Sequence, residues 1–80
     1  MTTIELGKKL RELYDTPGAN KVAMIHLFGI LYANELDHPD HNINEILKTA
    51  DMYESYRSEI NKGKRLARYV RLKDEYVGKF

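Results

Sequence analysis

The chain has 80 residues, a length that allows one domain with a single modest hydrophobic core. It contains no cysteine, and 42% of its residues are hydrophobic and 31% charged. This composition excludes a disulfide-stapled protein and a disordered one, and it favours a cytoplasmic location. The start lacks the apolar centre of a signal peptide, and the most apolar run is too short to span a bilayer. We therefore expect no membrane partner.

The net charge of +1 hides an uneven distribution along the chain. Residues 61–80 contain seven Lys and Arg against two acidic residues, whereas residues 21–60 contain three against seven. A basic block of this kind either binds phosphate groups or only keeps an exposed surface hydrated. Charge alone favours the second interpretation.

The first segment predicts a capped helix followed by a tight turn. Thr2 and Glu5 have the spacing of a capping box, and leucines then recur at helical period, which predicts a helix from Thr3 to Asp15. In the run Thr16–Ala19, Pro and Gly occupy the two central positions that a type II turn requires.

The next predicted helix is the most apolar part of the chain. Asn20 can cap it, and it should run to about Leu36 as a central, largely buried element. Gly29 inside this helix suggests a close helix crossing. Three apolar residues lie beside the main buried stripe and could face a second subunit, namely Met24, Leu27 and Leu31.

Potential metal ligands gather in the loop Asp37–His41, which holds two Asp and two His. This Pro-containing loop offers neither a rigid frame nor a distant fourth ligand, so we expect a solvated loop rather than a metal site. His26 should be a hydrogen-bonded core or interface residue. No nucleophile–base arrangement and no glycine-rich phosphate loop occurs. We therefore expect no cofactor, no small-molecule substrate and no enzymatic activity.

Residues 42–65 predict two short helices joined by a turn. Asn42 and Glu45 repeat the capping spacing, and the apolar residues after Asn42 lie at i, i+3, i+4 and i+7, which makes one buried stripe. The stripe consists of Ile43, Ile46, Leu47 and Ala50. Asp51 stands where the chain must turn, and Asp tolerates the left-handed conformation better than most residues.

The second helix of this pair is predicted at about residues 53–62. Met52, Tyr56 and Ile60 recur at steps of four, so they should face the core and leave the opposite polar side exposed. Gly63 stands at the position of a C-terminal helix stop, and a basic run follows it.

The last segment, residues 64–77, has apolar residues at loosely helical spacing. It predicts a fifth helix that packs on the first two, and the charged end beyond Gly78 should fray. The sequence therefore predicts an all-α fold, a single domain over residues 1–80. This fold is a compact bundle of about five short helices that contains a helix-turn-helix at about residues 42–65.

Residues 43–65 resemble the helix-turn-helix of lambda-repressor-like, or Xre-type, transcriptional regulators, whose recognition helix closes with a hydrophobic residue and a Gly-basic tail. Here that ending is Ile60–Arg65. The chain also resembles small bacterial and phage proteins described as HTH-like, in which Ser-Tyr-x-x-Glu-Ile-x-Lys-Gly, here Ser55–Gly63, precedes Leu-Ala-x-Tyr-Val, here Leu66–Val70. The resemblance implies a DNA-binding regulator with the second helix in the major groove.

Three positions depart from the Xre pattern, which usually has Ala at Leu47, Gly at Asp51, and Val or Ile at Arg57. Wider helix spacing absorbs Leu47, and Asp51 can occupy the turn. An inward Arg57 would bury a charge. We therefore expect the helix to rotate so that Tyr56 fills the core and Arg57 turns to the flank.

Two groups of side chains would contact double-stranded DNA. Those expected to reach base edges are Ser55, Arg57, Ser58 and Asn61, with Arg57 pairing with guanine and Asn61 with adenine. Those expected on phosphates are Lys62, Lys64, Arg65 and Arg68. Alternatively, Arg57 pairs with Glu54 or Asn61 and the basic tail only adds solubility.

One recognition helix seldom gives enough specificity, so we expect a homodimer on a palindromic site. A second hypothesis is a helical module that keeps the fold and binds a protein instead of DNA. In that case four tyrosines would form an exposed aromatic patch, because aromatic residues anchor protein interfaces. They are Tyr53, Tyr56, Tyr69 and Tyr76.

Overall fold

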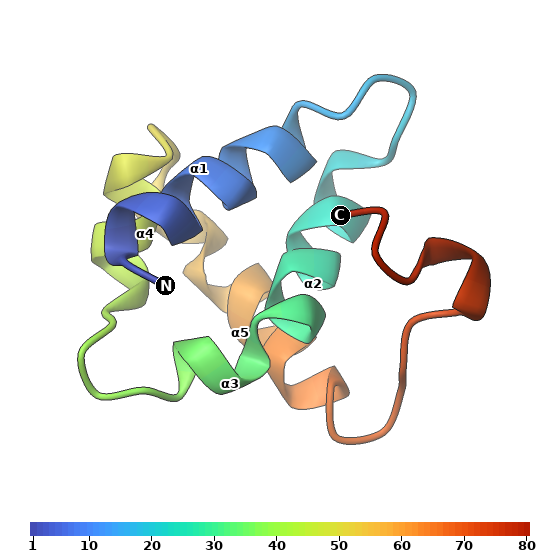
Figure 1. The fold of residues 1–80 in the computed structure, drawn as a ribbon. Coiled ribbons are helices and arrows are strands. Elements are labelled where there is room, and N and C mark those ends of the chain that lie inside the picture. The colour runs from blue at the N-terminus through green and yellow to red at the C-terminus, as the bar shows by residue number, and fades with distance from the viewer.

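The computed structural model describes all 80 residues and contains five α-helices, two single 3₁₀ turns and no strand, which confirms the all-α prediction. Figure 1 shows α1 and α2 in front of α5, with α4 on the far side of α1. The helices are α1 (Thr3–Tyr14), α2 (Lys21–Leu31), α3 (Ala33–Leu36), α4 (Ile43–Thr49) and α5 (Arg57–Leu66). The 3₁₀ turns are η1 (Glu54–Tyr56) and η2 (Asp74–Tyr76). No helix is both long enough and apolar enough to cross a membrane.

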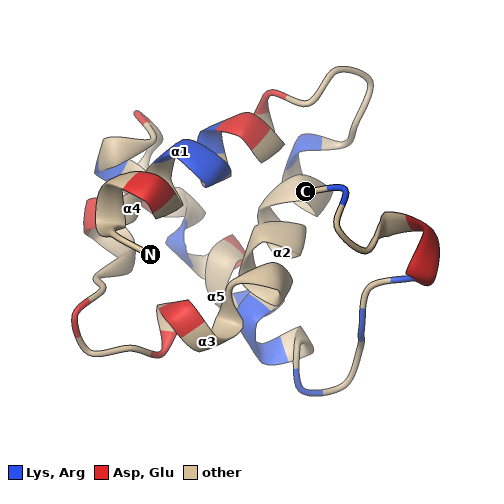
Figure 2. Ribbon diagram, viewed as in Figure 1, with Lys and Arg blue, Asp and Glu red and all other residues tan.

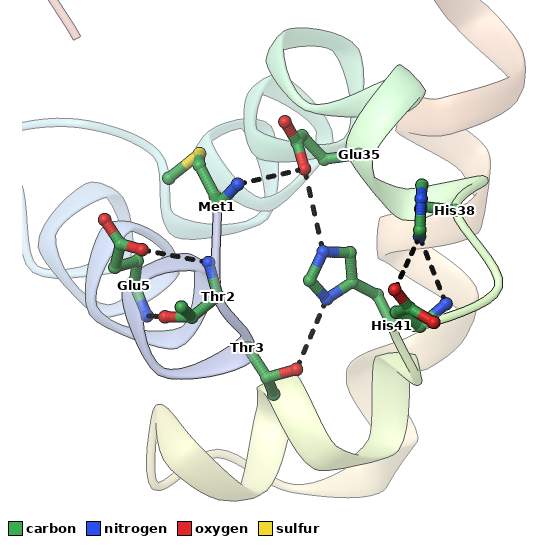
Figure 3. Close-up of polar contacts among 8 residues, drawn as sticks. Met1, Thr2, Thr3, Glu5, Glu35, His38 and His41 are labelled. Atoms are coloured by element: carbon green, nitrogen blue, oxygen red, sulfur yellow. Dashed lines mark hydrogen bonds and ion pairs between the residues drawn. The ribbon is translucent and has the colours of Figure 1, made fainter.

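The predicted capping box and first turn are confirmed. The Thr2 hydroxyl accepts a hydrogen bond from the Glu5 amide at 3.1 Å, and the Glu5 carboxylate accepts one from the Thr2 amide at 2.9 Å (Figure 3). In the turn after α1, the Ala19 amide bonds the Thr16 carbonyl at 3.3 Å, and Gly18 has a φ of 75°. The glycine supplies the positive φ that a type II turn needs at this position.

The predicted helix from Asn20 to Leu36 starts and stops as expected but is interrupted at Tyr32. The φ of Tyr32 is −112° and its ψ is 24°, so its backbone leaves the helical region between α2 and α3. The break keeps its hydrogen bonds, since the Tyr32 amide bonds the Phe28 carbonyl at 3.0 Å and the Leu36 amide bonds the Tyr32 carbonyl at 2.9 Å. Apolar periodicity continues across such a break, which is why the pattern predicted one helix.

The core consists of apolar side chains from all five helices, and no polar or charged side chain is buried in it. Phe28 of α2 is among the largest fully buried side chains. Burial of a side chain of this size stabilises a fold by about 1.5–3 kcal/mol. The core residues are Leu6, Leu10, Leu13, Met24, Ile25, Phe28, Leu36, Ile46, Leu47, Ala50 and Ile60.

Two glycines allow α2 and α5 to cross closely. A Cβ added to Gly29 would lie 2.5 Å from the carbonyl oxygen of Ile60 and 2.7 Å from the amide nitrogen of Lys64. A Cβ added to Gly63 would collide with the backbone of His26. The close crossing predicted at Gly29 is confirmed. The helix stop predicted at Gly63 is wrong, because Gly63 lies inside α5 and is required there for the approach of two backbones.

The fifth helix predicted over residues 64–77 is also wrong. The backbone after α5 turns and then extends, forms η2, turns again at Gly78 and brings Phe80 back against the core, as the red end beside α2 in Figure 1 illustrates. The end of the chain is therefore packed rather than frayed. Leu72, Tyr76 and Phe80 are spaced four apart, which imitates a helical stripe, and these three side chains line one groove on α2.

Candidate nucleic-acid interface

The turn between α4 and α5 has the predicted left-handed residue. Asp51 has a φ of 58°, and the amide of Met52 bonds the carbonyl of Leu47 at 2.9 Å, which closes the end of α4. The Arg11 guanidinium of α1 lies 3.4 Å from the carbonyl oxygens of both Ala50 and Asp51. Sequence reasoning missed this contact, since Arg11 and the turn are about 40 residues apart along the chain and no local pattern links them.

The predicted rotation at the start of α5 is confirmed. Tyr56 is half-buried, its hydroxyl lies 3.1 Å from the hydroxyl of Tyr14, and the two ring centroids are 5.7 Å apart. The hydrogen bond with Tyr14 raises the pKa of Tyr56 above its ordinary value. Arg57 is exposed at the flank, so its charge stays in water.

The four predicted base-reading residues lie together. Ser55, Arg57, Ser58 and Asn61 line one open, polar depression, and the rest of its lining is Glu54, Lys62 and Arg65. Three of the four readers belong to α5, whereas Ser55 lies in η1, one turn ahead of α5. The predicted bounds of the reading helix, about residues 53–62, are therefore wrong, because the α-helix begins only at Arg57 and continues to Leu66. Arg57 forms neither of the alternative contacts with Glu54 or Asn61 and has no ion pair, so its guanidinium is unpaired in this depression.

The four predicted phosphate-binding residues differ in their contacts. Lys62 pairs with Glu59 at 3.0 Å, and Lys64 pairs with Asp37 at 2.8 Å, while Arg65 and Arg68 are exposed and unpaired. The Lys64 side chain is only 28% exposed and turns toward the loop after α3. An exposed ion pair such as that of Lys62 contributes about 0–1 kcal/mol and is easily exchanged. Arg65 and Arg68 are therefore the cations most available to an anion.

The prediction that His26 is a hydrogen-bonded residue is confirmed. Its Nε2 lies 2.5 Å from Oε2 of Glu59, which joins α2 to α5 beside the glycine crossing. The other oxygen of Glu59 accepts from Lys62. The hydrogen bonds from Lys62 and from His26 hold the pKa of Glu59 below its ordinary value.

This lowered pKa predicts a loss of stability in acid. Glu59 stabilises the fold above its ordinary pKa of 4.5, and that contribution disappears as the pH falls through the lower pKa of the folded state. We expect Glu59→Gln to lower the urea midpoint at pH 7 and to match the unsubstituted protein near pH 3. Glu54→Gln, which removes an exposed carboxylate without an ion pair, should change neither value. A deficit in Glu59→Gln that persists at pH 3 would contradict the assignment.

The histidines of the loop Asp37–His41 form contacts within the fold. The His41 ring lies with Nδ1 3.3 Å from the Thr3 hydroxyl and Nε2 3.6 Å from Glu35, whose carboxylate also meets the terminal amine of Met1 at 3.4 Å (Figure 3). His38 instead contacts Asp40. These contacts tie the start of α1 to α3. No three His, Cys, Asp or Glu side chains are grouped to hold a metal ion.

The exposed tyrosine patch required by the protein-binding hypothesis is not formed. Tyr56 is packed against Tyr14, and its hydroxyl is already bonded. Tyr53 and Tyr69 are 79% and 81% exposed, but Tyr53 lies just before η1, whereas Tyr69 and Tyr76 belong to the segment after α5. Figure 1 places these two segments on opposite sides of the molecule.

We compared the chain with curated protein sequences, solved structures and models of protein families, and only a family model matches it. No curated protein sequence and no solved structure matches the chain significantly. The model of a family described as "HTH-like domain" matches residues 2–73. This range begins at the cap of α1 and ends beyond α5, so it covers the whole helical bundle rather than the two helices of the motif alone. The chain therefore belongs to the HTH-like domain family.

Proposed function

We propose that the protein is a DNA-binding transcriptional regulator that inserts α5 into the major groove of double-stranded DNA. The observation that carries the proposal is the depression formed by η1 and α5. There, side chains able to read base edges are exposed directly after a helix-turn-helix turn, and an unpaired Arg57 lies among them. Family membership supports the same function.

The roles divide by chemistry. Arg57 has the planar donor fork that pairs with the acceptors of guanine, and Asn61 can donate to and accept from adenine. Ser55 and Ser58 can bond several base edges. Phosphate contacts would come mainly from Arg65 and Arg68, with Lys62 able to exchange its partner. Lys64 would contribute less, because Asp37 already neutralises it.

We further propose that the protein binds as a homodimer, as Xre-type regulators would on a palindromic site. Two half-sites about 34–36 Å apart would each receive one α5. The three residues expected to face a second subunit do not support self-association, since Met24 is buried in the core and Leu27 and Leu31 are half-buried against it. Apolar surface remains at Val22 and Val70, which are 44% and 45% exposed.

Salt dependence of binding tests the proposal. In titrations of labelled random duplex at 50 and 200 mM salt, affinity should fall steeply as salt rises. Arg65→Ala with Arg68→Ala should reduce the slope of log K against log salt by about 1.8, since each lost phosphate contact contributes about 0.9. Lys8→Ala with Lys9→Ala removes the same charge from α1, outside the depression formed by η1 and α5, and should leave the slope nearly unchanged.

Absence of binding at low salt would contradict the proposal, and equal slopes for the two double variants would place the DNA on another surface. Selection from a random duplex pool would then give the preferred site. On that site, a stoichiometry of one chain per duplex would contradict the homodimer.

A further inference from the structure

The unpaired cations of the chain are concentrated on α5 and the segment that follows it. Of the 13 Lys and Arg residues, Lys9, Arg11, Lys62 and Lys64 form ion pairs, and Lys21 and Lys79 lie over tyrosine rings. The seven others are Lys8, Lys48, Arg57, Arg65, Arg68, Arg71 and Lys73. Five of these seven belong to residues 57–73. Such cations can meet an anion without breaking an internal ion pair.

Two of these cations, Arg71 and Lys73, lie on an extended segment that we call the basic arm, residues 70–73. The backbone of Lys73 has φ −62° and ψ 147°, which is extended. These angles are those of polyproline II, an open conformation without internal hydrogen bonds. Leu72 is half-buried in the apolar groove on α2, whereas Arg71 and Lys73, its two neighbours, are exposed.

The basic arm is fixed at both ends. At its start the amides of Tyr69 and Val70 bond the carbonyl of Leu66 at 2.9 and 3.1 Å, so the arm leaves directly from the last turn of α5. After it, η2 brings Tyr76 onto the groove on α2. The backbone that carries the two cations is therefore attached at both ends, and it loses less conformational entropy on binding than a free tail would.

The basic residues of α5 and of the segment after it also lie apart from the acidic residues of α3. Figure 2 shows blue residues running from α5 into the following segment along the lower right of the molecule, whereas the acidic residues of α3 and of the loop after it lie at the lower left. Asp74 and Glu75 of η2 mark the end of the basic arm. The arm thus continues the basic edge that begins on α5.

We propose that the basic arm binds the phosphate backbone of the same duplex, next to the part of the major groove that α5 would occupy. This inference rests on the proposed function. Arg71 and Lys73 stand two residues apart, which at the polyproline II rise of about 3.1 Å per residue is a separation of about 6 Å. They would each contact one phosphate, continuing the line of Arg65 and Arg68 beyond the end of the helix.

The test is a salt titration of the full chain with Arg71→Gln and Lys73→Gln against the same labelled duplex. Loss of two phosphate contacts should reduce the salt slope by about 1.8. Between 50 and 200 mM salt, the unsubstituted protein should then lose about 12-fold more affinity than the variant. Both side chains are exposed, so the unfolding temperature should stay unchanged. Lys8→Gln with Lys9→Gln is the control of equal charge on α1.

Phosphate ethylation interference locates the contacts. The unsubstituted protein should show interference at phosphates flanking the site, and the arm variant should lose that flanking interference alone. If the protein binds DNA but the arm variant keeps the full slope and interference pattern, the proposal that the basic arm contacts phosphates is wrong, and the proposed function stands. If the unsubstituted protein does not bind duplex at low salt, both are wrong.

Discussion

Replacing Gly63 with Ala is expected to destabilise the fold by about 2 kcal/mol or more. Alanine favours a helix over glycine by about 1 kcal/mol, so propensity alone predicts a gain in stability. The added Cβ, however, would collide with the backbone of His26, which cannot move aside as a flexible side chain can. Overpacking costs about 1–3 kcal/mol and occasionally more, and a collision with rigid backbone falls at the upper end of that range, which outweighs the gain.

Urea unfolding followed by circular dichroism measures this effect. A loss of this size is a large part of the about 5–15 kcal/mol that stabilises a small domain. Gly63→Val should be worse still. Ser58→Ala, at an exposed position of the same helix, should change stability by no more than about 0.5 kcal/mol. If Gly63→Ala were as stable as the unsubstituted protein, α2 and α5 could not cross as described.

Replacing Arg57 with Ala is expected to weaken binding to the selected DNA site by about 1–3 kcal/mol, which is roughly 5- to 150-fold. Arg57 is unpaired in the depression formed by η1 and α5, so its donors are free for a base. The loss should be specific to one base pair. A repeated selection with Arg57→Ala should show tolerance at one position, a guanine, and Asn61→Ala should do the same at an adenine.

A phosphate-contact variant provides the comparison. Arg65→Ala should weaken binding about equally to all sequences, because a phosphate contact carries no base information. If Arg57→Ala also weakened all sequences equally, Arg57 would be a phosphate ligand and the reading face would have to be assigned elsewhere on α5.

Much of the local structure could be predicted from the residues alone. The capping box at Thr2, the turn at Gly18 and the left-handed Asp51 each depend on a few neighbouring residues, so a short sequence window contains the cause. The rotation at Tyr56 and Arg57 also followed, since burying the aromatic ring is favourable and burying the charge is not.

The errors lie where a local pattern has two tertiary outcomes. Gly63 suits both a helix end and a close crossing, and only the approach of His26 decides between them. The apolar spacing over residues 64–77 suits a helix, yet an irregular segment brings Leu72 and Tyr76 of this stretch, together with Phe80, to the groove on α2.

In the candidate site, too, some features could be predicted from the local sequence and others depend on tertiary contacts. The spacing placed Arg57, Ser58 and Asn61 on one polar face. The helical repeat is fixed, so the positions of the apolar residues alone show which face of the helix is buried and which is not. The ion pairs of Lys62 with Glu59 and of Lys64 with Asp37 could not be predicted from the spacing of residues in the sequence. A helical i, i+3 pair is only one of several options open to a lysine, and Asp37 lies in a distant loop.

By itself, the sequence determined the helical class, the helix-turn-helix and the exposed polar face of α5, because caps, turns and apolar period act over a few residues. The tertiary structure decided which cations are unpaired, where α2 breaks and how the chain continues after α5. These depend on contacts between segments far apart in the chain, such as the glycine crossing of α2 and α5, whose geometry no local pattern records.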